Sequence, residues 1–210
     1  MDLGVWQEEC NGWAQLFGFA AGLSLREPSM DQLANCRSVG EELKAHLPEE
    51  AFPQLLLAVK KEDIDAIRQE FFDLFFVPVS GSYSSPYEAL QPNNGRHNEA
   101  GGNIGRIYAA TGFTPGLLAD IPSYLKRLNR PDYIGFELAF MANVFRAASQ
   151  GTDPEEISAL RHTAVLFHEK HLSRWATAFG HQVAQKAQSS YFRACGECTA
   201  YMAGAFSLEE

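Results

Sequence analysis

The sequence predicts an all-α protein that folds as a single helical domain of about eight to ten helices over residues 1–210. Strand-like alternation of apolar and polar residues is nearly absent, whereas apolar residues recur at three- and four-residue steps along the chain. Pro-acid and Ser-x-x-Gln signals for helix starts precede several of these periodic segments. No internal repeat and no change in composition indicates a domain boundary.

The first two periodic segments are predicted to be long helices. Residues 4–23 place aromatic and aliphatic side chains along one side, although each of three glycines weakens this helix by about 1 kcal/mol unless another helix packs close. Ser29 and Gln32 have the spacing of a capping box, which predicts a helix over 29–46. The three glycines are Gly12, Gly18 and Gly22.

A short third segment is bracketed by Pro48 and Pro53, and a strongly amphipathic helix follows over residues 62–76, where Pro78 ends it. This fourth helix carries an excess of phenylalanine. Because a helix in a two-layer packing buries one stripe, one or two of these rings are expected outside the main core. The rings are Phe71, Phe72, Phe75 and Phe76.

A long connection covers residues 77–97, and loops of this length in a compact domain are uncommon and tend to be functional or disordered. Helicity is predicted to resume at Asn98 and to stop at Gly112, which suits a left-handed C-cap. A helix is predicted over 129–150, with Pro131 in its first turn and an acid beside the positive end of its dipole. Three more helices are predicted. The first begins at 152–156, and the final two cover about 172–188 and 190–205.

Composition restricts the classes of function. The formal charge of −9 argues against unspecific nucleic-acid binding, because such binding depends on Lys and Arg. No window offers the ~18 apolar residues that a bilayer span requires. The acidic first ten residues do not resemble a secretory signal, and four irregularly spaced cysteines do not suggest a disulfide scaffold, so a cytoplasmic location is expected.

The chain offers no complete catalytic or cofactor motif. Cys195 and Cys198 form a CxxC without a second pair or a βαβ setting, so we expect two core residues. The glycines at 101–105 are neither preceded by a strand nor followed by Gly-Lys-Ser/Thr, and the Ser-rich stretch at 82–85 has no Gly-x-Ser-x-Gly elbow. We therefore expect no cofactor, no metal and no catalytic residue.

Five segments occur in order over about residues 70 to 206: Asp73-Leu-Phe-Phe-Val-Pro78, Ser85-Pro-Tyr-Glu-Ala-Leu90, Pro131 to Met141, His171-Leu-Ser-Arg-Trp175, and Tyr191 to Glu197. In order and spacing they resemble the TorD/DmsD/NarJ group of cytoplasmic chaperones. The family patterns are roughly Tyr-x-x-Leu-Phe, Pro-Tyr-Glu-Ser-Val-Tyr, Pro-Asp-His with Glu-Leu-x-Phe-Met, His-Leu-x-x-Trp, and Phe-Tyr-Arg-Ala-Leu-Gly-Glu.

The resemblance implies a non-catalytic, all-helical, TorD/DmsD-like molecular chaperone. Its expected partner is the twin-arginine signal peptide, or the apo-form, of a molybdenum-cofactor oxidoreductase, whose export it delays while the cofactor is inserted. No nucleic acid and no stable membrane insertion are expected, and the protein would be a monomer or a homodimer. The −9 charge would help to capture a basic peptide.

The resemblance also indicates where the peptide binds. Asp132 and Glu88 are candidate partners for the leader arginines, because carboxylates match guanidinium forks; either could instead be structural, Asp132 at a helix start and Glu88 within its own loop. Tyr133 replaces the usual His of the family, so a role that needs a protonatable ring is not expected here. The expected peptide-binding residues are Phe71, Phe72, Phe75, Pro78, Pro86, Tyr87, Glu88, Pro131, Asp132, Tyr133 and Glu137.

Two alternatives use other residues. A helical metal-dependent enzyme would use the cluster of His162, His168 and His171. A non-catalytic oligomeric scaffold would instead use the Phe-rich helix as a subunit interface, in which case Phe72→Ala would weaken association.

Overall fold

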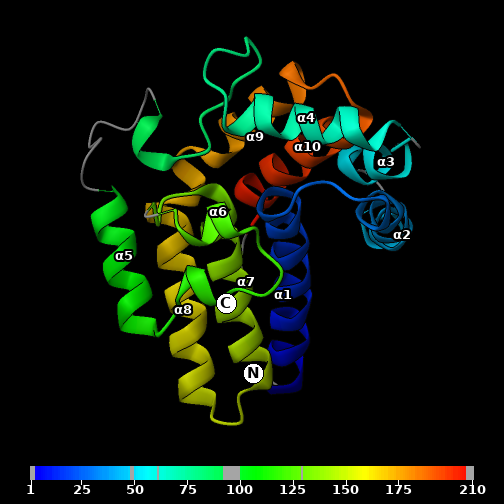
Figure 1. Cartoon of the computed structure of the whole chain (residues 1–210). Helices are drawn as coiled ribbons and strands as arrows, with labels where there is room; N and C mark the ends of the chain where they lie inside the picture. Colours follow the sequence, from blue (N-terminus) through cyan, green and yellow to red (C-terminus); the bar gives the residue numbers. More distant parts are fainter. Residues whose placement is uncertain (1–2, 48–49, 61, 92–99, 129, 207–210) are drawn as a thin grey trace. The chain divides into compact units, whose positions relative to one another are not determined.

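Ten α-helices and three 3₁₀ helices make up the computed structural model, which describes residues 3–47, 50–60, 62–91, 100–128 and 130–206 (Figure 1). No β-strand occurs in these ranges, which confirms the all-α prediction. The chain divides into two compact units. The prediction of one domain over 1–210 stays a prediction.

Unit 1 comprises residues 1–26, 87–175 and 205–210. Its long helices α1, α7 and α8 lie side by side in Figure 1. The helices of unit 1 are α1 Leu3–Leu25, η1 Glu88–Leu90, α5 Ala100–Thr111, η2 Pro115–Leu117, α6 Ser123–Lys126, α7 Ile134–Gln150, α8 Pro154–Lys170 and η3 Leu172–Arg174. The 3₁₀ turn η2 and the short α6 lie in a stretch where the sequence predicted only a connection.

Helix α7 is the centre of the unit 1 core. Buried residues occur on nearly all of its faces, as expected for a helix surrounded by neighbours. Phe145 stacks on Phe17 of α1 with ring centroids 5.9 Å apart, while Phe140 contacts Phe167 of α8 at 4.5 Å and Tyr108 of α5 at 5.1 Å. These aromatic contacts hold α1, α5 and α8 against α7.

Unit 2 comprises residues 27–86 and 176–204. Two carboxylates accept hydrogen bonds from backbone N–H groups at the start of α10. Glu62, just before α4, accepts from Ser190 at 2.9 Å, and Glu70, within α4, accepts from Ser189 at 3.2 Å. These bonds satisfy N–H groups that a helix start leaves without partners, and they place negative charge at the positive end of the dipole. The helices of unit 2 are α2 Met30–His46, α3 Ala51–Leu57, α4 Ile64–Phe75, α9 Ala176–Lys186 and α10 Ser190–Gly204.

Most predicted helix starts are confirmed. Ser29 is the N-cap of α2, and its hydroxyl accepts from the Gln32 N–H at 3.2 Å. Asp153 is the N-cap of α8. Gly112, the predicted left-handed C-cap, directly follows α5 and has a φ of +73°. Pro53 lies inside the first turn of α3 rather than at its boundary, because a first-turn proline lacks only an N–H that has no helical partner. Pro48, Asn98 and the segment 92–97 lie outside the described residues.

Two predicted starts are wrong. Helix α7 begins at Ile134 with Tyr133 as N-cap, so Pro131 precedes the helix and Asp132 does not cap it. Residues 172–174 form the 3₁₀ turn η3, and α9 begins only at Ala176. In the first case residues 131–132 form a turn, and Tyr133 is extended and pairs with Tyr87, so the helix begins only at Ile134.

The CxxC cysteines belong to the core of unit 2, as predicted. Cys195 and Cys198 are buried free thiols on α10. Burial raises the pKa of both thiols, that of Cys198 to about 12, so neither is activated as a thiolate. Among the helices that the structure describes, none is long and apolar enough to cross a membrane.

Candidate functional site

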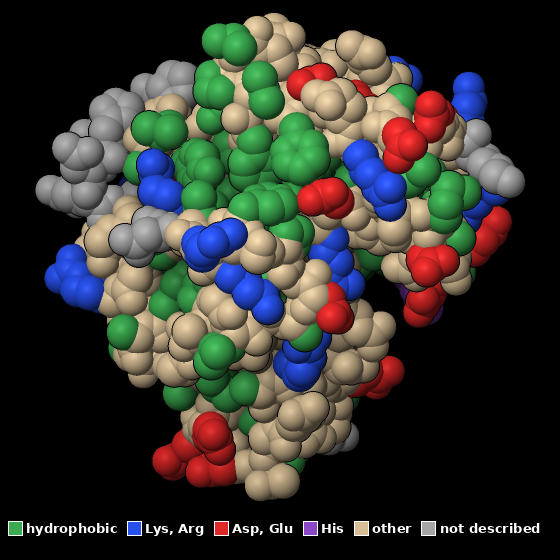
Figure 2. Space-filling view, in the orientation of Figure 1, with side chains coloured by type: hydrophobic (Ala, Val, Ile, Leu, Met, Phe, Trp, Pro, Cys, Tyr) green, Lys and Arg blue, Asp and Glu red, His purple; other side chains and the backbone are tan. Residues whose placement is uncertain are grey.

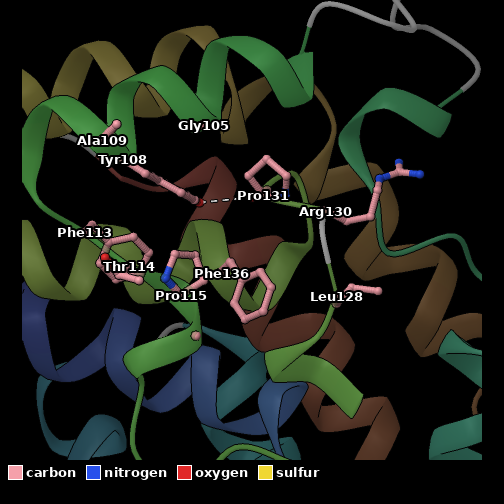
Figure 3. A pocket seen from close by; sticks show the side chains of 11 residues that line it. Gly105, Tyr108, Ala109, Phe113, Thr114, Pro115, Leu128, Arg130, Pro131 and Phe136 are labelled. Atoms are coloured by element: carbon pink, nitrogen blue, oxygen red, sulfur yellow. Dashed lines mark hydrogen bonds between the residues drawn. The ribbon is translucent and has the colours of Figure 1, made fainter. Parts of the chain in front are cut away.

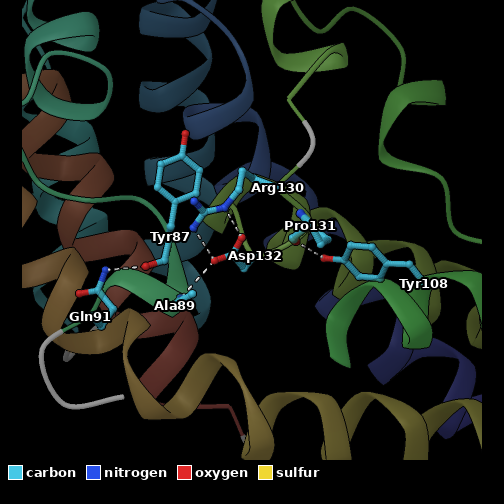
Figure 4. A network of polar contacts seen from close by, with 7 residues as sticks. All are labelled: Tyr87, Ala89, Gln91, Tyr108, Arg130, Pro131 and Asp132. Atoms are coloured by element: carbon cyan, nitrogen blue, oxygen red, sulfur yellow. Dashed lines mark hydrogen bonds and ion pairs between the residues drawn. The ribbon is translucent and has the colours of Figure 1, made fainter. Parts of the chain in front are cut away.

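The segments around Tyr87 and Tyr133 meet in unit 1 and form the framework of the candidate site (Figure 4). An isolated antiparallel bridge joins Tyr87 to Tyr133, and the Glu88 N–H donates to the Asp132 carbonyl at 3.0 Å. The Ala89 N–H donates to Asp132 Oδ2 at 3.1 Å. The sequence motifs Pro-Tyr-Glu and Pro-Asp-Tyr are thus brought together by backbone and side-chain hydrogen bonds.

Asp132 has a guanidinium partner within its own segment. Arg130 Nε and Arg130 Nη2 donate to Asp132 Oδ1 and Oδ2 at 2.9 and 3.0 Å, which is the bidentate geometry typical of Arg–carboxylate pairs. The Arg130 guanidinium also lies over the Tyr87 ring, 4.4 Å from its centroid. The Asp132 side chain is 1% exposed and that of Arg130 is 38% exposed. Asp132 is therefore a buried carboxylate covered by a surface arginine.

Glu88 also has a partner in the chain. His171 Nδ1 lies 2.9 Å from Glu88 Oε2, and both side chains are buried. His171 follows α8, so this contact ties the η1 turn to the end of that helix. The arrangement matches the structural alternative for Glu88, and its role in peptide binding stays a prediction.

Glu137 is the third acidic group of the cluster and is completely buried. Among the described residues, neither carboxyl oxygen of Glu137 has a hydrogen bond of good geometry. The Trp175 side chain makes a weaker contact that lowers the pKa of Glu137 in part. Burial, and then the nearby charges of Glu88 and Asp132, hold the pKa of Glu137 well above its ordinary value. We expect this carboxyl group to be protonated near neutral pH.

Tyr133, which occupies the position of the family's histidine, is fully buried. Its hydroxyl donates to the Ser24 carbonyl at 2.6 Å, near the end of α1 where helix carbonyls have no helical partner. Burial raises the pKa of Tyr133 well above its ordinary value, so the hydroxyl remains a donor. In this chain the position anchors α1 rather than presenting a titratable ring.

A pocket of about 350 Å³ is lined in part by Arg130 and Pro131 (Figure 3). Its lining is mostly apolar, and the Tyr108 hydroxyl donates to the Pro131 carbonyl at 3.2 Å, which fixes the segment beside it. Small ligand pockets have volumes of about 300–1,000 Å³, so this one suits an apolar side chain or a short segment. It is lined chiefly by Tyr108, Phe113, Pro115, Leu128, Pro131 and Phe136.

The remaining predicted site residues lie in unit 2. Phe71 and Phe75 are buried and contact Phe192 at 6.3 and 5.8 Å, so they pack the core. Phe72 is half-buried, as predicted for one or two rings of this helix. Hydrophobic side chains gather over the C-terminal end of α4 on the face drawn in Figure 2. Pro78 is exposed and Pro86 is buried. Peptide binding by these residues stays a prediction.

The three histidines of the metal alternative do not share a site. His171 contacts Glu88, His168 packs on the Phe206 ring at 4.7 Å, and His162 is exposed. Within the described ranges, no group of three or more His, Cys, Asp or Glu residues is placed to hold a metal ion.

Several site residues were not assigned from the sequence. Arg130 lies two residues before Asp132 in the sequence, and this spacing was the signal that could have predicted their ion pair. His171 was assigned a role only as a metal ligand, although it also begins the segment that resembles the His-Leu-x-x-Trp pattern. The pocket residues Phe113, Leu128 and Phe136 had no local signal, because only packing in three dimensions brings them together.

Comparison with known proteins gave one family match. The family model described as nitrate reductase delta subunit matches residues 40–180. Searches of curated proteins and of solved structures gave no match to the chain.

Proposed function

We propose, from the premise that this chain belongs to the nitrate reductase delta subunit family, that it binds the twin-arginine leader of a molybdoenzyme subunit before export. The family is one of non-catalytic chaperones that assist molybdoenzyme maturation. The match over residues 40–180 is the observation that carries the proposal. Leader binding is the step that titration calorimetry tests, and the cytoplasm is its proposed location.

The pocket beside Pro131 supports this proposal as a place for an apolar side chain of the leader. Burying two or three leucine-sized side chains would contribute roughly 3–9 kcal/mol before the costs of ordering the peptide. The acidic cluster of Glu88, Asp132 and Glu137 is close to this pocket, because Asp132 follows Pro131 and the pocket residue Tyr108 is near all three carboxylates. An apolar pocket next to buried carboxylates suits a segment that carries both arginines and leucines.

Titration calorimetry tests the proposal. Twin-arginine leader peptides of molybdoenzymes, beginning with any encoded beside this gene, would be titrated into the purified full-length protein. We expect saturable one-to-one binding by at least one leader. Absence of binding by every leader and by the intact apo-enzyme would overturn the proposed function.

A matched pair of variants locates the site. Ala109 is exposed on α5 and lines the pocket, whereas Ala110 is exposed on the same helix and does not line it. Ala109→Arg adds bulk and positive charge at the pocket and should weaken leader binding by about tenfold or more, while Ala110→Arg should change it less than about twofold. Equal affinities for the two variants would place the leader elsewhere on the protein.

A further inference from the structure

Arg130 is held as a bound arginine ligand would be. Its guanidinium donates two hydrogen bonds to Asp132 and covers the Tyr87 ring, so it combines bidentate and cation–π contacts in one place (Figure 4). We call the Asp132 carboxylate and the Tyr87 ring together the arginine seat. Nothing in this pair of contacts requires that the guanidinium come from the same chain.

The occupant of the seat lies at the surface, whereas its partner does not. The Arg130 side chain is 38% exposed and that of Asp132 is 1% exposed. The Asp132 carboxylate also accepts a hydrogen bond from the Ala89 N–H at 3.1 Å, so it stays in position when Arg130 moves. A guanidinium from outside therefore competes with Arg130 for the Asp132 carboxylate.

We propose that Arg130 is an internal placeholder in the arginine seat and that an arginine of the leader displaces it on binding. The inference rests on the proposed function and adds a regulatory step to it. The arginine seat then has two alternative occupants, Arg130 of this chain and an arginine of the leader.

The exchange has a physical consequence for specificity. A buried carboxylate that loses its cation is strongly destabilised, but replacing one guanidinium by another leaves Asp132 paired throughout. Arg130 is attached two residues away and so competes at a high effective concentration. An isolated arginine therefore displaces it poorly, and net affinity must come from other contacts of the same peptide. The pocket formed by Leu128, Pro131 and Phe136 lies beside the seat and can supply them.

Removal of the placeholder tests the seat without any leader. In Arg130→Ala, Asp132 keeps its buried position and loses its cation, so we expect a lower thermal midpoint. Methylguanidinium at millimolar concentration, compared with potassium chloride at equal ionic strength, should raise the midpoint of this variant. It should not raise that of the wild type, of Arg130→Ala combined with Asp132→Asn, or of Arg127→Ala. Arg127 is an exposed arginine of the same segment and serves as the matched control.

Leader titration tests the displacement. Arg130→Ala should bind a twin-arginine leader about tenfold more tightly than the wild type, because the internal competitor is absent. A leader with both arginines replaced by lysine should lose this gain, because lysine cannot form the fork. Should Arg130→Ala fold poorly, Arg130→Lys retains the charge without the bidentate geometry and should show a smaller gain of the same sign.

The outcomes separate the inference from the function on which it rests. Leader binding by the wild type, together with equal or weaker binding by Arg130→Ala and no methylguanidinium rescue, would overturn the placeholder and leave the proposed function standing. Rescue without leader binding by any variant would support the arginine seat and overturn the proposed function.

Discussion

Three carboxylates of one cluster show how environment assigns different roles to chemically similar residues. Asp132 accepts from Arg130 and from a backbone N–H, and Glu88 contacts His171, so both carboxylates have polar partners in the chain. Glu137 is as deeply buried but lacks a cation among the described residues, and its pKa is raised well above the ordinary value. We therefore expect the Glu137 carboxyl group to be neutral within the cluster.

Glu137→Gln should stabilise the protein increasingly as pH rises. In the folded state Glu137 keeps its proton above the ordinary glutamate pKa, whereas in the unfolded state it has lost it, so the folded state binds more protons. Stability contributed by this site therefore falls as pH rises, by up to about 1.4 kcal/mol per pH unit between the unfolded and folded pKa. Glutamine does not titrate and removes this loss.

Urea unfolding of both proteins from pH 5 to 8 measures the effect. The difference in free energy of unfolding should be small near pH 5 and should grow toward pH 8 in favour of Glu137→Gln. Glu169→Gln, at an exposed position of α8, provides the control. A difference that stays constant over this range would mean that Glu137 titrates with an ordinary pKa.

Tyr133→Phe should lower the free energy of unfolding by about 1–3 kcal/mol, because it leaves the buried Ser24 carbonyl without its donor. The substitution keeps the ring and hence its packing in the core. Thermal or urea denaturation measures the change, with Tyr83→Phe as a comparison at a half-buried tyrosine. If both variants lose the same small amount, the Tyr133 hydroxyl does not stabilise α1.

At the scale of elements, the contact between α9 and α10 depends on two glycines. A Cβ on Gly180 would lie 2.5 Å from the Gly196 carbonyl oxygen, and a Cβ on Gly196 would lie 2.5 Å from the Gly180 carbonyl oxygen. Both clashes are with backbone atoms, which cannot move aside as a flexible side chain can. These two positions let the helix backbones approach each other closely.

Gly196→Ala should therefore destabilise unit 2 by at least about 1–3 kcal/mol, although alanine is the better helix former. Gly204→Ala in the same helix meets only ordinary contacts with Thr177 at 3.5 Å or more and should change stability little. Gly12→Ala in α1 meets nothing within 4 Å and should stabilise by about 0.5–1 kcal/mol. Urea denaturation followed by circular dichroism would measure all three. A stabilising Gly196→Ala would contradict the close approach.

Helix α7 illustrates how a partner segment fixes where an element begins. Asn129 to Asp132 had the composition of a helix start, yet the helix begins at Ile134. Tyr133 pairs with Tyr87 and the Asp132 carbonyl accepts from the Glu88 N–H, so residues 131–132 form a turn and Tyr133 is extended instead of continuing the helix. Hydrogen bonds to a segment more than forty residues away outweigh the local signal, and they also create the arginine seat.

At the scale of the whole molecule, the formal charge of −9 should accelerate the capture of a basic leader. Screening shortens the reach of this attraction, so the association rate should fall steeply as salt rises from about 50 to 500 mM, while the dissociation rate changes less. Stopped-flow fluorescence with a labelled leader measures both rates. A leader with its arginines replaced by glutamine should show a weaker dependence. An association rate independent of salt would contradict long-range attraction.

The sequence by itself determined the helical class, most helix starts and the family. These features follow from periodicity, capping residues and motifs that lie within a few positions of one another, so they are readable locally. Ser29, Asp153 and Gly112 are examples, because a cap acts on the backbone of its own turn. The core role of Cys195 and Cys198 likewise followed from their apolar surroundings in the chain.

Only the tertiary structure decided which polar residues are paired and which glycines matter. The contacts of Asp132 with Ala89, of Glu88 with His171 and of Tyr133 with Ser24 join residues separated by 43, 83 and 109 positions. Burial and hydrogen bonding depend on every neighbour in space, so burial raises the pKa of the Glu137 carboxyl while the Asp132 carboxylate is paired with Arg130. No spacing along the chain contains that information.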